Sequence, residues 1–178
     1  MTQKAREVLE DCRLALQMLE DETDMQRWRI LWAAAAALIR AVGHVLDKVD
    51  GRNPSIKSVG GIFFKRWKQE SCHEIFRNFI EGERNSILKE YQSGVHPLED
   101  VSVVVQMHLD PVNGGAPKVI AQTLDLDDNV YRPMLDGPWQ GDDCRDVLRE
   151  AIDWWSEQLD AIDVEVKRCE ASTAEPGK

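Results

Sequence analysis

The sequence has few cysteines, and those it has are far apart. Cys12, Cys72, Cys144 and Cys169 form no C-x-x-C pair, and their spacing does not suggest a zinc site. The chain does not open with the charged segment and apolar run of a secretory signal. We therefore expect a cytoplasmic protein with reduced thiols, and the sequence predicts neither a bound metal nor another cofactor.

A long uninterrupted hydrophobic run is also missing. The most apolar stretch, residues 31–46, is interrupted by Arg40 and His44. It is shorter than the roughly 20 apolar residues that a helix needs to span a bilayer. The sequence therefore predicts no membrane-spanning helix.

Basic residues are outnumbered by acidic ones. The chain has 22 Lys and Arg against 32 Asp and Glu, which gives a net charge of −10. This balance disfavours wrapping of nucleic acid by the whole surface. Residues 25–94, however, hold 12 Lys and Arg against 7 Asp and Glu. If the protein binds a polyanion, the middle of the chain is the expected surface; the alternative is that these charges only solvate a helix face.

The length and composition fit one globular domain over residues 1–178, with a frayed tail from about residue 170. Of the residues, 43 % are hydrophobic and 30 % are charged. Apolar residues recur at helical spacing in four segments: residues 3–21, about 25–49 after an Asp24 cap, 62–92 with a break expected near Gly82, and about 142–169. Residues 51–61 are interpreted as a loop.

Two β-branched segments interrupt the helical pattern. Val101 to Leu109 and Lys118 to Leu126 flank the turn signal Pro-Val-Asn-Gly-Gly. The alternation predicts a β-hairpin, inserted at about residues 100–126, with one face packed on the helices. The predicted fold is therefore all-α: a four-to-five-helix up-and-down bundle with an inserted β-hairpin before the last helix.

The segment Phe79–Tyr91 carries a short motif, FIEGERNSILKEY, that resembles the HEPN superfamily. The family signature is Arg, often followed by Asn, then His four to six residues after the Arg and an aromatic residue beyond. Arg84, Asn85 and Tyr91 match, and Lys89 stands at the His position. The resemblance implies a small helical bundle and a homodimer whose motifs face each other across a cleft. Active members are metal-independent RNases of toxin–antitoxin, phage-defence and RNA-processing systems, and other members serve as binding modules.

The chemistry of RNA cleavage assigns roles to these residues. Arg84 has the fixed fork of donors that suits a charged phosphorane. Histidine suits proton transfer, whereas Lys89 titrates near about 10.4 and acts as a base only if its pKa is strongly lowered. Arg84 and Lys89 also lie about 140° apart on an ideal helix. We therefore expect phosphate binding by Arg84 and Asn85 and weak or absent catalysis by Lys89.

Other residues complete the candidate site. His44 is one of the polar residues in the most apolar segment, and it could replace the missing His or be an ordinary interfacial histidine. Arg40 lies one turn before His44, and Arg77 lies on the Arg84 side of its helix. With Tyr91 they form the candidate substrate-binding set. Trp154 and Trp155 point in directions about 100° apart, so one of them is expected at an interface with another chain or partly buried under the hairpin or a loop.

The sequence supports three functional hypotheses. The first is a HEPN-like dimeric protein, related to nucleic acid or to bacterial defence, whose RNase activity is doubtful because the catalytic His is replaced. The second is a non-enzymatic interaction module that binds a protein partner with the hairpin and the acidic last helix. The third is a small-ligand binder that uses a cleft between helices.

Overall fold

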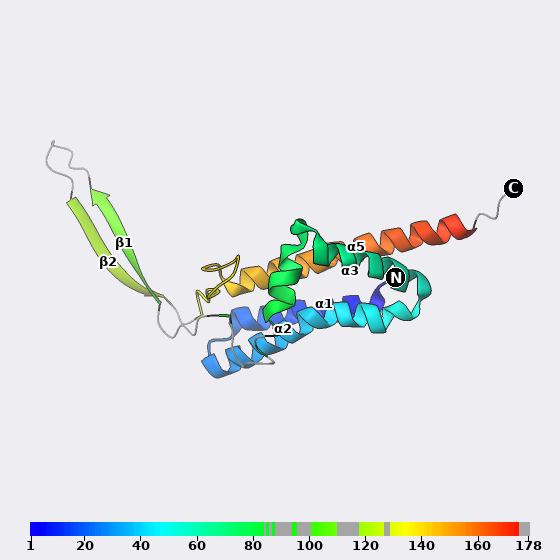
Figure 1. Cartoon of the computed structure of the whole chain (residues 1–178). Coiled ribbons are helices and arrows are strands. Elements are labelled where there is room, and N and C mark those ends of the chain that lie inside the picture. The colour runs from blue at the N-terminus through cyan, green and yellow to red at the C-terminus, as the bar shows by residue number, and fades with distance from the viewer. Residues whose placement is uncertain are drawn as a thin grey trace.

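The computed structural model describes residues 1–83, 85, 87, 94–95, 101–109, 118–126 and 129–174. The chain is mostly helical with one two-stranded antiparallel hairpin. Figure 1 shows the long helices lying side by side, with the hairpin extending away from them at one end. The predominantly helical fold predicted from the sequence is confirmed.

The first two helices pack against each other. α1 (Gln3–Asp21) is amphipathic, and its buried stripe includes Leu9, Cys12 and Leu19. α2 (Met25–Lys48) begins at Asp24, whose carboxylate accepts a hydrogen bond from the Arg27 backbone N–H at 2.8 Å. A side-chain cap of this kind satisfies a donor that has no partner within the helix. Both segments and the Asp24 cap agree with the sequence prediction.

The third helix differs from the prediction. α3 runs from Pro54 to Gln69 and follows the 3-10 turn η1 (Asp50–Arg52). Asn53 caps it by accepting from the Ser55 N–H at 2.8 Å, and Pro54 occupies the first turn, where its missing N–H is harmless. Gly60 and Gly61, which we interpreted as loop, therefore lie inside α3.

The chain breaks after α3 and again at Glu81, next to Gly82, where a break was expected. Glu70 has extended backbone (ψ 136°) and ends the helix, and the 3-10 turn η2 (Ser71–His73) and the π-helical turn η3 (Ile75–Ile80) follow. The Arg77 guanidinium donates to the carbonyl oxygens of Trp67, Glu70 and Ser71. These bonds satisfy carbonyls at the end of α3. The helical pattern predicted over residues 62–92 is therefore interrupted at Glu70 as well, which the sequence analysis did not expect.

The last helix, α5 (Cys144–Ala174), ends five residues later than the predicted end at residue 169. Trp154 and Trp155 are both buried, and they have different partners. Trp155 donates its indole N–H to the Ile39 carbonyl at 2.9 Å, and Trp154 donates to His73 Nδ1 at 3.2 Å. Neither tryptophan lies under the hairpin, and both are buried within the chain; Trp154 packs against the η2 turn, in agreement with the alternative of burial under a loop.

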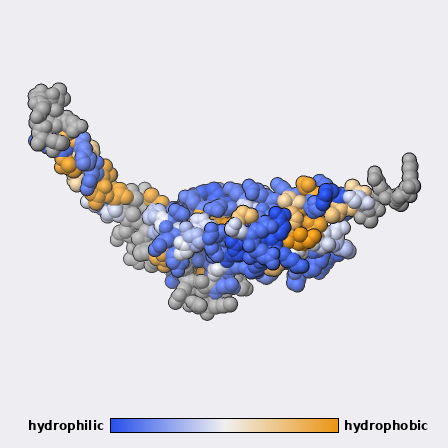
Figure 2. Space-filling view, turned by 45° about the horizontal axis from the view of Figure 1, so that its top comes forward, coloured by the Kyte–Doolittle hydropathy of each residue, from blue (hydrophilic) through white to orange (hydrophobic). Residues whose placement is uncertain are grey.

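The hairpin consists of β1 (Val101–Leu109) and β2 (Lys118–Leu126), paired in antiparallel register from Val101↔Leu126 to Leu109↔Lys118. Both strands are confirmed at their predicted bounds. The predicted packing on the bundle is wrong: the side chains described on both faces are exposed. Figure 2 shows apolar surface along this arm. Strand alternation fixes which residues share a face but not what covers that face.

The α2 region passes a composition test for membrane spans. Residues Met25–Arg52 are long and apolar enough to cross a bilayer, and 33 % of the most apolar part is buried in the protein. A core helix of a soluble protein passes the same test, so this finding alone does not place the chain in a membrane.

Candidate functional site

Part of the motif lies outside the described residues. The structure says nothing of Arg84, Lys89 and Tyr91, so the roles predicted for them stay predictions. Asn85 is half-buried, and Ile87 is buried with 8 % exposure. Glu81 and Glu83, at the start of the motif segment, are described, and their side chains bond to residues of α2.

The first tie joins Glu81 to Arg40. The Arg40 guanidinium lies 3.1 Å from the Glu81 carboxylate, and both side chains are largely buried, at 18 % and 17 % exposure. Lys68 of α3 also forms an ion pair with Glu81. The Arg40 guanidinium lies 5.8 Å from the Phe76 ring centroid, within cation–π range. Arg40 therefore positions the start of the motif segment against α2.

The second tie joins Glu83 to Trp32. The Trp32 indole N–H donates to Glu83 Oε1 at 2.9 Å, and the Gly94 backbone N–H donates to the same oxygen at 3.0 Å. Burial raises the pKa of Glu83, and the two hydrogen bonds oppose that rise. Glu83 thus joins the Gly94 backbone to α2 through the Trp32 side chain.

The outward side of α2 is apolar and partly exposed. The residues on it recur at alternating steps of four and three: Ile30, Ala34, Ala37, Ala41, His44 and Lys48. Ile30 is 61 % exposed, Ala34 is exposed, and Ala37 and Ala41 are half-buried. Steps of four and three form the seam of a helix that pairs with another helix. We call this side of α2 the seam.

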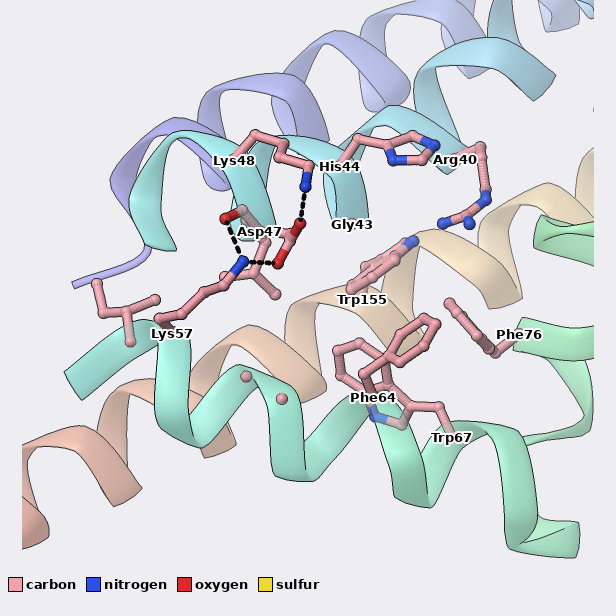
Figure 3. A pocket seen from close by; sticks show the side chains of 14 residues that line it. Arg40, Gly43, His44, Asp47, Lys48, Lys57, Phe64, Trp67, Phe76 and Trp155 are labelled. Atoms are coloured by element: carbon pink, nitrogen blue, oxygen red, sulfur yellow. Dashed lines mark hydrogen bonds and ion pairs between the residues drawn. The ribbon is translucent and has the colours of Figure 1, made fainter. Parts of the chain in front are cut away.

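A groove opens between α2 and α3, beside the seam. Its volume is about 380 Å³, and the residues that line it come from α2, α3, η3 and α5. Arg40 and His44 both line it, so the structure brings these two candidate residues together. Figure 3 shows Lys48 and Lys57 reaching toward Asp47 at one end of the groove and the rings of Phe64, Trp67 and Trp155 gathered at the other.

The groove is cationic in an acidic protein. Arg40, Lys48 and Lys57 line it together with a single carboxylate, Asp47. Lys48 lies 3.0 Å from the Asp47 carboxylate, and Lys57 pairs with the other oxygen. Hydrogen bonds from Lys57 and Lys48 lower the pKa of Asp47. Since Arg40 is paired with Glu81, Lys48 and Lys57 against Asp47 leave a formal excess of one positive charge, with His44 counted as neutral.

Arg77, a predicted substrate-binding residue, is placed elsewhere. Its three bonds to carbonyl oxygens at the end of α3 engage the guanidinium in the fold. This arrangement gives Arg77 a structural role at the junction between α3 and η3.

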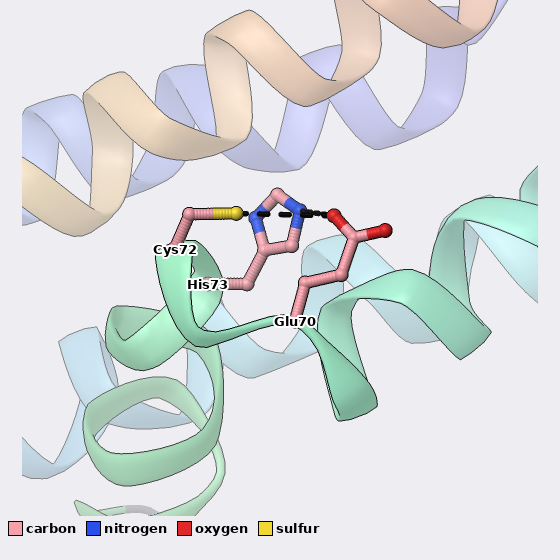
Figure 4. A group of neighbouring side chains, drawn as sticks. All are labelled: Glu70, Cys72 and His73. Atoms are coloured by element: carbon pink, nitrogen blue, oxygen red, sulfur yellow. Dashed lines mark hydrogen bonds and ion pairs between the residues drawn. The ribbon is translucent and has the colours of Figure 1, made fainter.

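Glu70, Cys72 and His73 form a second cluster of titratable groups (Figure 4). Trp154 donates its N–H to His73 Nδ1, so that nitrogen is unprotonated and Nε2 carries the proton of the neutral ring. Burial lowers the pKa of His73 and favours this neutral form. A metal ligand needs a nitrogen lone pair that no donor occupies. The donor set therefore does not fit a metal, although its atoms lie within 4.8 Å of one another.

Sequence reasoning missed Lys57, Phe64 and Gly60 as groove residues. For Lys57 and Gly60, the cause was the interpretation of residues 51–61 as a loop. The Asn53-Pro54 pair, an N-cap followed by proline in the first turn, was the signal that α3 begins there. No family model, curated protein or solved structure matches the chain.

Proposed function

We propose that the protein is a HEPN-like cytoplasmic homodimer, related to nucleic acid or bacterial defence, with weak or absent RNase activity. The observation that carries the proposal is the attachment of the motif segment to α2. Glu81 pairs with Arg40 and Glu83 with Trp32, beside the exposed seam. A second copy on the seam would bring two motif segments to one interface, as the family resemblance implies.

The seam is suited to pair with itself. If two copies of α2 cross antiparallel, with the two-fold axis level with residue 39, Ile30 of one copy faces Lys48 of the other. Ala34 then faces His44, and Ala37 faces Ala41. An isologous interface requires this kind of self-complementarity. The alanines also allow close approach of two helices, because their side chains are short.

This arrangement suggests how the two chains share a site. His44 of each copy would lie beside Ala34 of the other copy's α2, two residues along the chain from Trp32. Glu83 bonds to Trp32, so the motif segment begins at that end. Arg84 and Asn85 would bind phosphate, and His44 would be the group nearest to neutral pKa. Lys89 retains phosphate attraction but lacks a pKa suited to proton transfer at neutral pH.

The seam is tested with Ala37→Glu, which places a charge next to the proposed two-fold axis. Leu14→Glu is the control, because Leu14 is an exposed apolar residue (56 %) on α1. Light scattering at tens of micromolar protein should give a dimer for the wild type and the control and a monomer for Ala37→Glu. A monomeric wild type would refute the dimer.

RNA binding is tested separately by fluorescence anisotropy with single-stranded RNA. We expect salt-sensitive binding that Arg84→Ala weakens. Lys89→His should raise cleavage if the geometry suits the family's chemistry. If His44 transfers the proton, the wild type cleaves RNA without metal near neutral pH, and His44→Ala abolishes cleavage. RNA cleavage that neither His44→Ala nor Arg84→Ala affects would place the site elsewhere.

A second candidate function is a non-enzymatic interaction module that uses the hairpin. The observation that favours it is the apolar face shared by Val103, Val105, Met107, Ile120 and Leu124, which are 37–46 % exposed. A two-stranded hairpin is marginally stable in water by itself, and covering such a face would stabilise it. Surface charges at Val105 and Ile120 should then abolish partner binding and leave RNA binding intact.

A further inference from the structure

The groove between α2 and α3 meets the seam at His44 and Lys48 and continues onto α3 residues that the proposed dimer and motif do not use. The α3 side contributes Lys57, Gly60, Gly61 and Phe64. Phe64 borders it and is 42 % exposed. Added Cβ atoms at Gly60 and Gly61 would meet no atom within 4 Å, so these two glycines leave space open along α3.

The two ends of the groove differ in chemistry. At one end, Lys48 and Lys57 share the Asp47 carboxylate, which leaves that end net positive. An ammonium group has three N–H donors, so each lysine can bind an anion and keep its bond to Asp47. At the other end the walls are aromatic: the Phe64 and Trp67 rings pack edge to face at 6.4 Å, with Phe76 and Trp155 behind them.

We propose that this groove binds a small anion with a planar aromatic ring, of the size of a nucleotide. The anionic group lies between Lys48 and Lys57, and the ring lies against Phe64, with Arg40 above it. A volume of about 380 Å³ is at the lower end of the range for ligand sites. Nucleoside monophosphates and aryl sulfonates or carboxylates share this chemistry.

The aromatic end favours a ring over an alkyl chain. Aromatic pairs gain about 0.5–1.5 kcal/mol beyond the area that they bury, and a flat ring can use this gain on Phe64. The protein as a whole carries a charge of −10, so an anion is drawn to the groove by local charge alone. The site is independent of Arg84, since no residue of the motif lines the groove among the described residues.

The test uses the full chain and isothermal titration calorimetry with four probes. AMP represents the nucleoside monophosphates, and naphthalene-2-sulfonate represents the aryl sulfonates; both are anions with an aromatic ring. Octyl phosphate is an anion with an alkyl chain, and inorganic phosphate has no apolar part. We expect at least one ring-bearing anion to bind, and octyl phosphate and inorganic phosphate to bind at least about tenfold more weakly, which corresponds to about 1.4 kcal/mol. Tighter binding of octyl phosphate than of either ring probe would overturn the proposal, as would no binding of either ring probe.

Two variants at one position locate the site. Gly60→Leu extends into the open part of the groove, whereas Gly60→Ala makes the same backbone change without filling it. We expect Gly60→Leu to weaken binding of the ring probe by more than about tenfold, and Gly60→Ala to leave it within about twofold. Circular dichroism confirms that both variants fold. Equal affinity of Gly60→Leu and wild type would place the binding elsewhere and overturn the proposal.

Charge and motif variants separate this inference from the proposed function. Lys57→Gln should lower the affinity for the ring-bearing probe by about tenfold at low salt, and it should reduce the salt dependence of that affinity. Arg84→Ala should leave that affinity unchanged, although it weakens binding of single-stranded RNA. A loss of probe binding in Arg84→Ala would show that the probe binds at the motif, and it would overturn the inference of a separate site in the groove. A loss of the dimer in Ala37→Glu with probe binding intact would leave this inference standing.

Discussion

The Trp32 indole N–H and the Gly94 backbone N–H both donate to one oxygen of the buried Glu83 carboxylate, at 2.9 and 3.0 Å. Trp32 is 1 % exposed and Glu83 is 8 % exposed. Removal of the carboxylate would leave the buried indole N–H of Trp32 without this acceptor. Such a group costs about 1–3 kcal/mol. We therefore expect Glu83→Ala to lower the free energy of unfolding by about that amount, measured by urea denaturation.

The protonation of Glu83 adds a pH dependence. Burial raises its pKa above the ordinary value, so the folded state binds more protons than the unfolded state in the window between the two pKa values. The contribution of Glu83 is fully present below the unfolded pKa and is lost as pH rises through the folded pKa. Relative to wild type, Glu83→Gln should become more stable as pH rises through this window. A constant difference between the two proteins across the window would contradict the assignment.

Asp143 should make the protein less stable as the pH falls, which is opposite to the pH dependence expected from Glu83. Burial tends to raise its pKa, but hydrogen bonds from the Arg145 side chain and from the backbone N–H groups of Arg145 and Arg132 outweigh this and lower it. The stability that it contributes is present above the unfolded pKa and is lost as pH falls through the folded pKa. We expect Asp143→Ala to cost about 1–3 kcal/mol at pH 7. The loss should shrink in acid, as chemical denaturation at several pH values would detect.

Two glycines should respond to alanine in opposite ways. Gly60 lies inside α3, where an added Cβ meets no atom within 4 Å, so Gly60→Ala should stabilise the protein by about 0.5–1 kcal/mol. At Gly43 an added Cβ would lie 3.0 Å from the Trp155 ring, which is buried and fixed by its bond to Ile39. Gly43→Ala should therefore lower the melting temperature, while Gly60→Ala raises it. The same sign for both would show that the indole of Trp155 can move aside.

The hairpin should contribute little to the stability of the helices. Its described side chains are exposed, and no described helix packs on either strand. Replacement of residues 101–126 by a short Gly-Ser linker should leave the free energy of unfolding within about 0.5 kcal/mol of wild type. Thermal and urea unfolding at low protein concentration provide the measurement. A large loss would mean that the arm stabilises the folded body through contacts made in solution.

The sequence determined the elements whose signals are local. Leu9, Cys12 and Leu19 repeat at the helical period. Asp24 caps α2 by accepting from the Arg27 backbone N–H, three residues away. The β-branched alternation from Val101 and from Lys118 fixed both strands at their bounds. These patterns depend on neighbours a few residues away, so they can be recognised before the chain folds.

The tertiary structure decided the groove and the placement of the tryptophans. Lys57 and Phe64 line the same groove as Arg40 only because α3 starts at Asn53-Pro54 and the chain turns at Glu70. Trp154 and Trp155 are both buried because α5 has neighbours on two sides, which helical periodicity alone does not reveal. The hairpin extends away from the helices, although the alternation of its residues predicted that one face packs on them. Local periodicity specifies a face, whereas the partner of that face depends on residues distant in sequence.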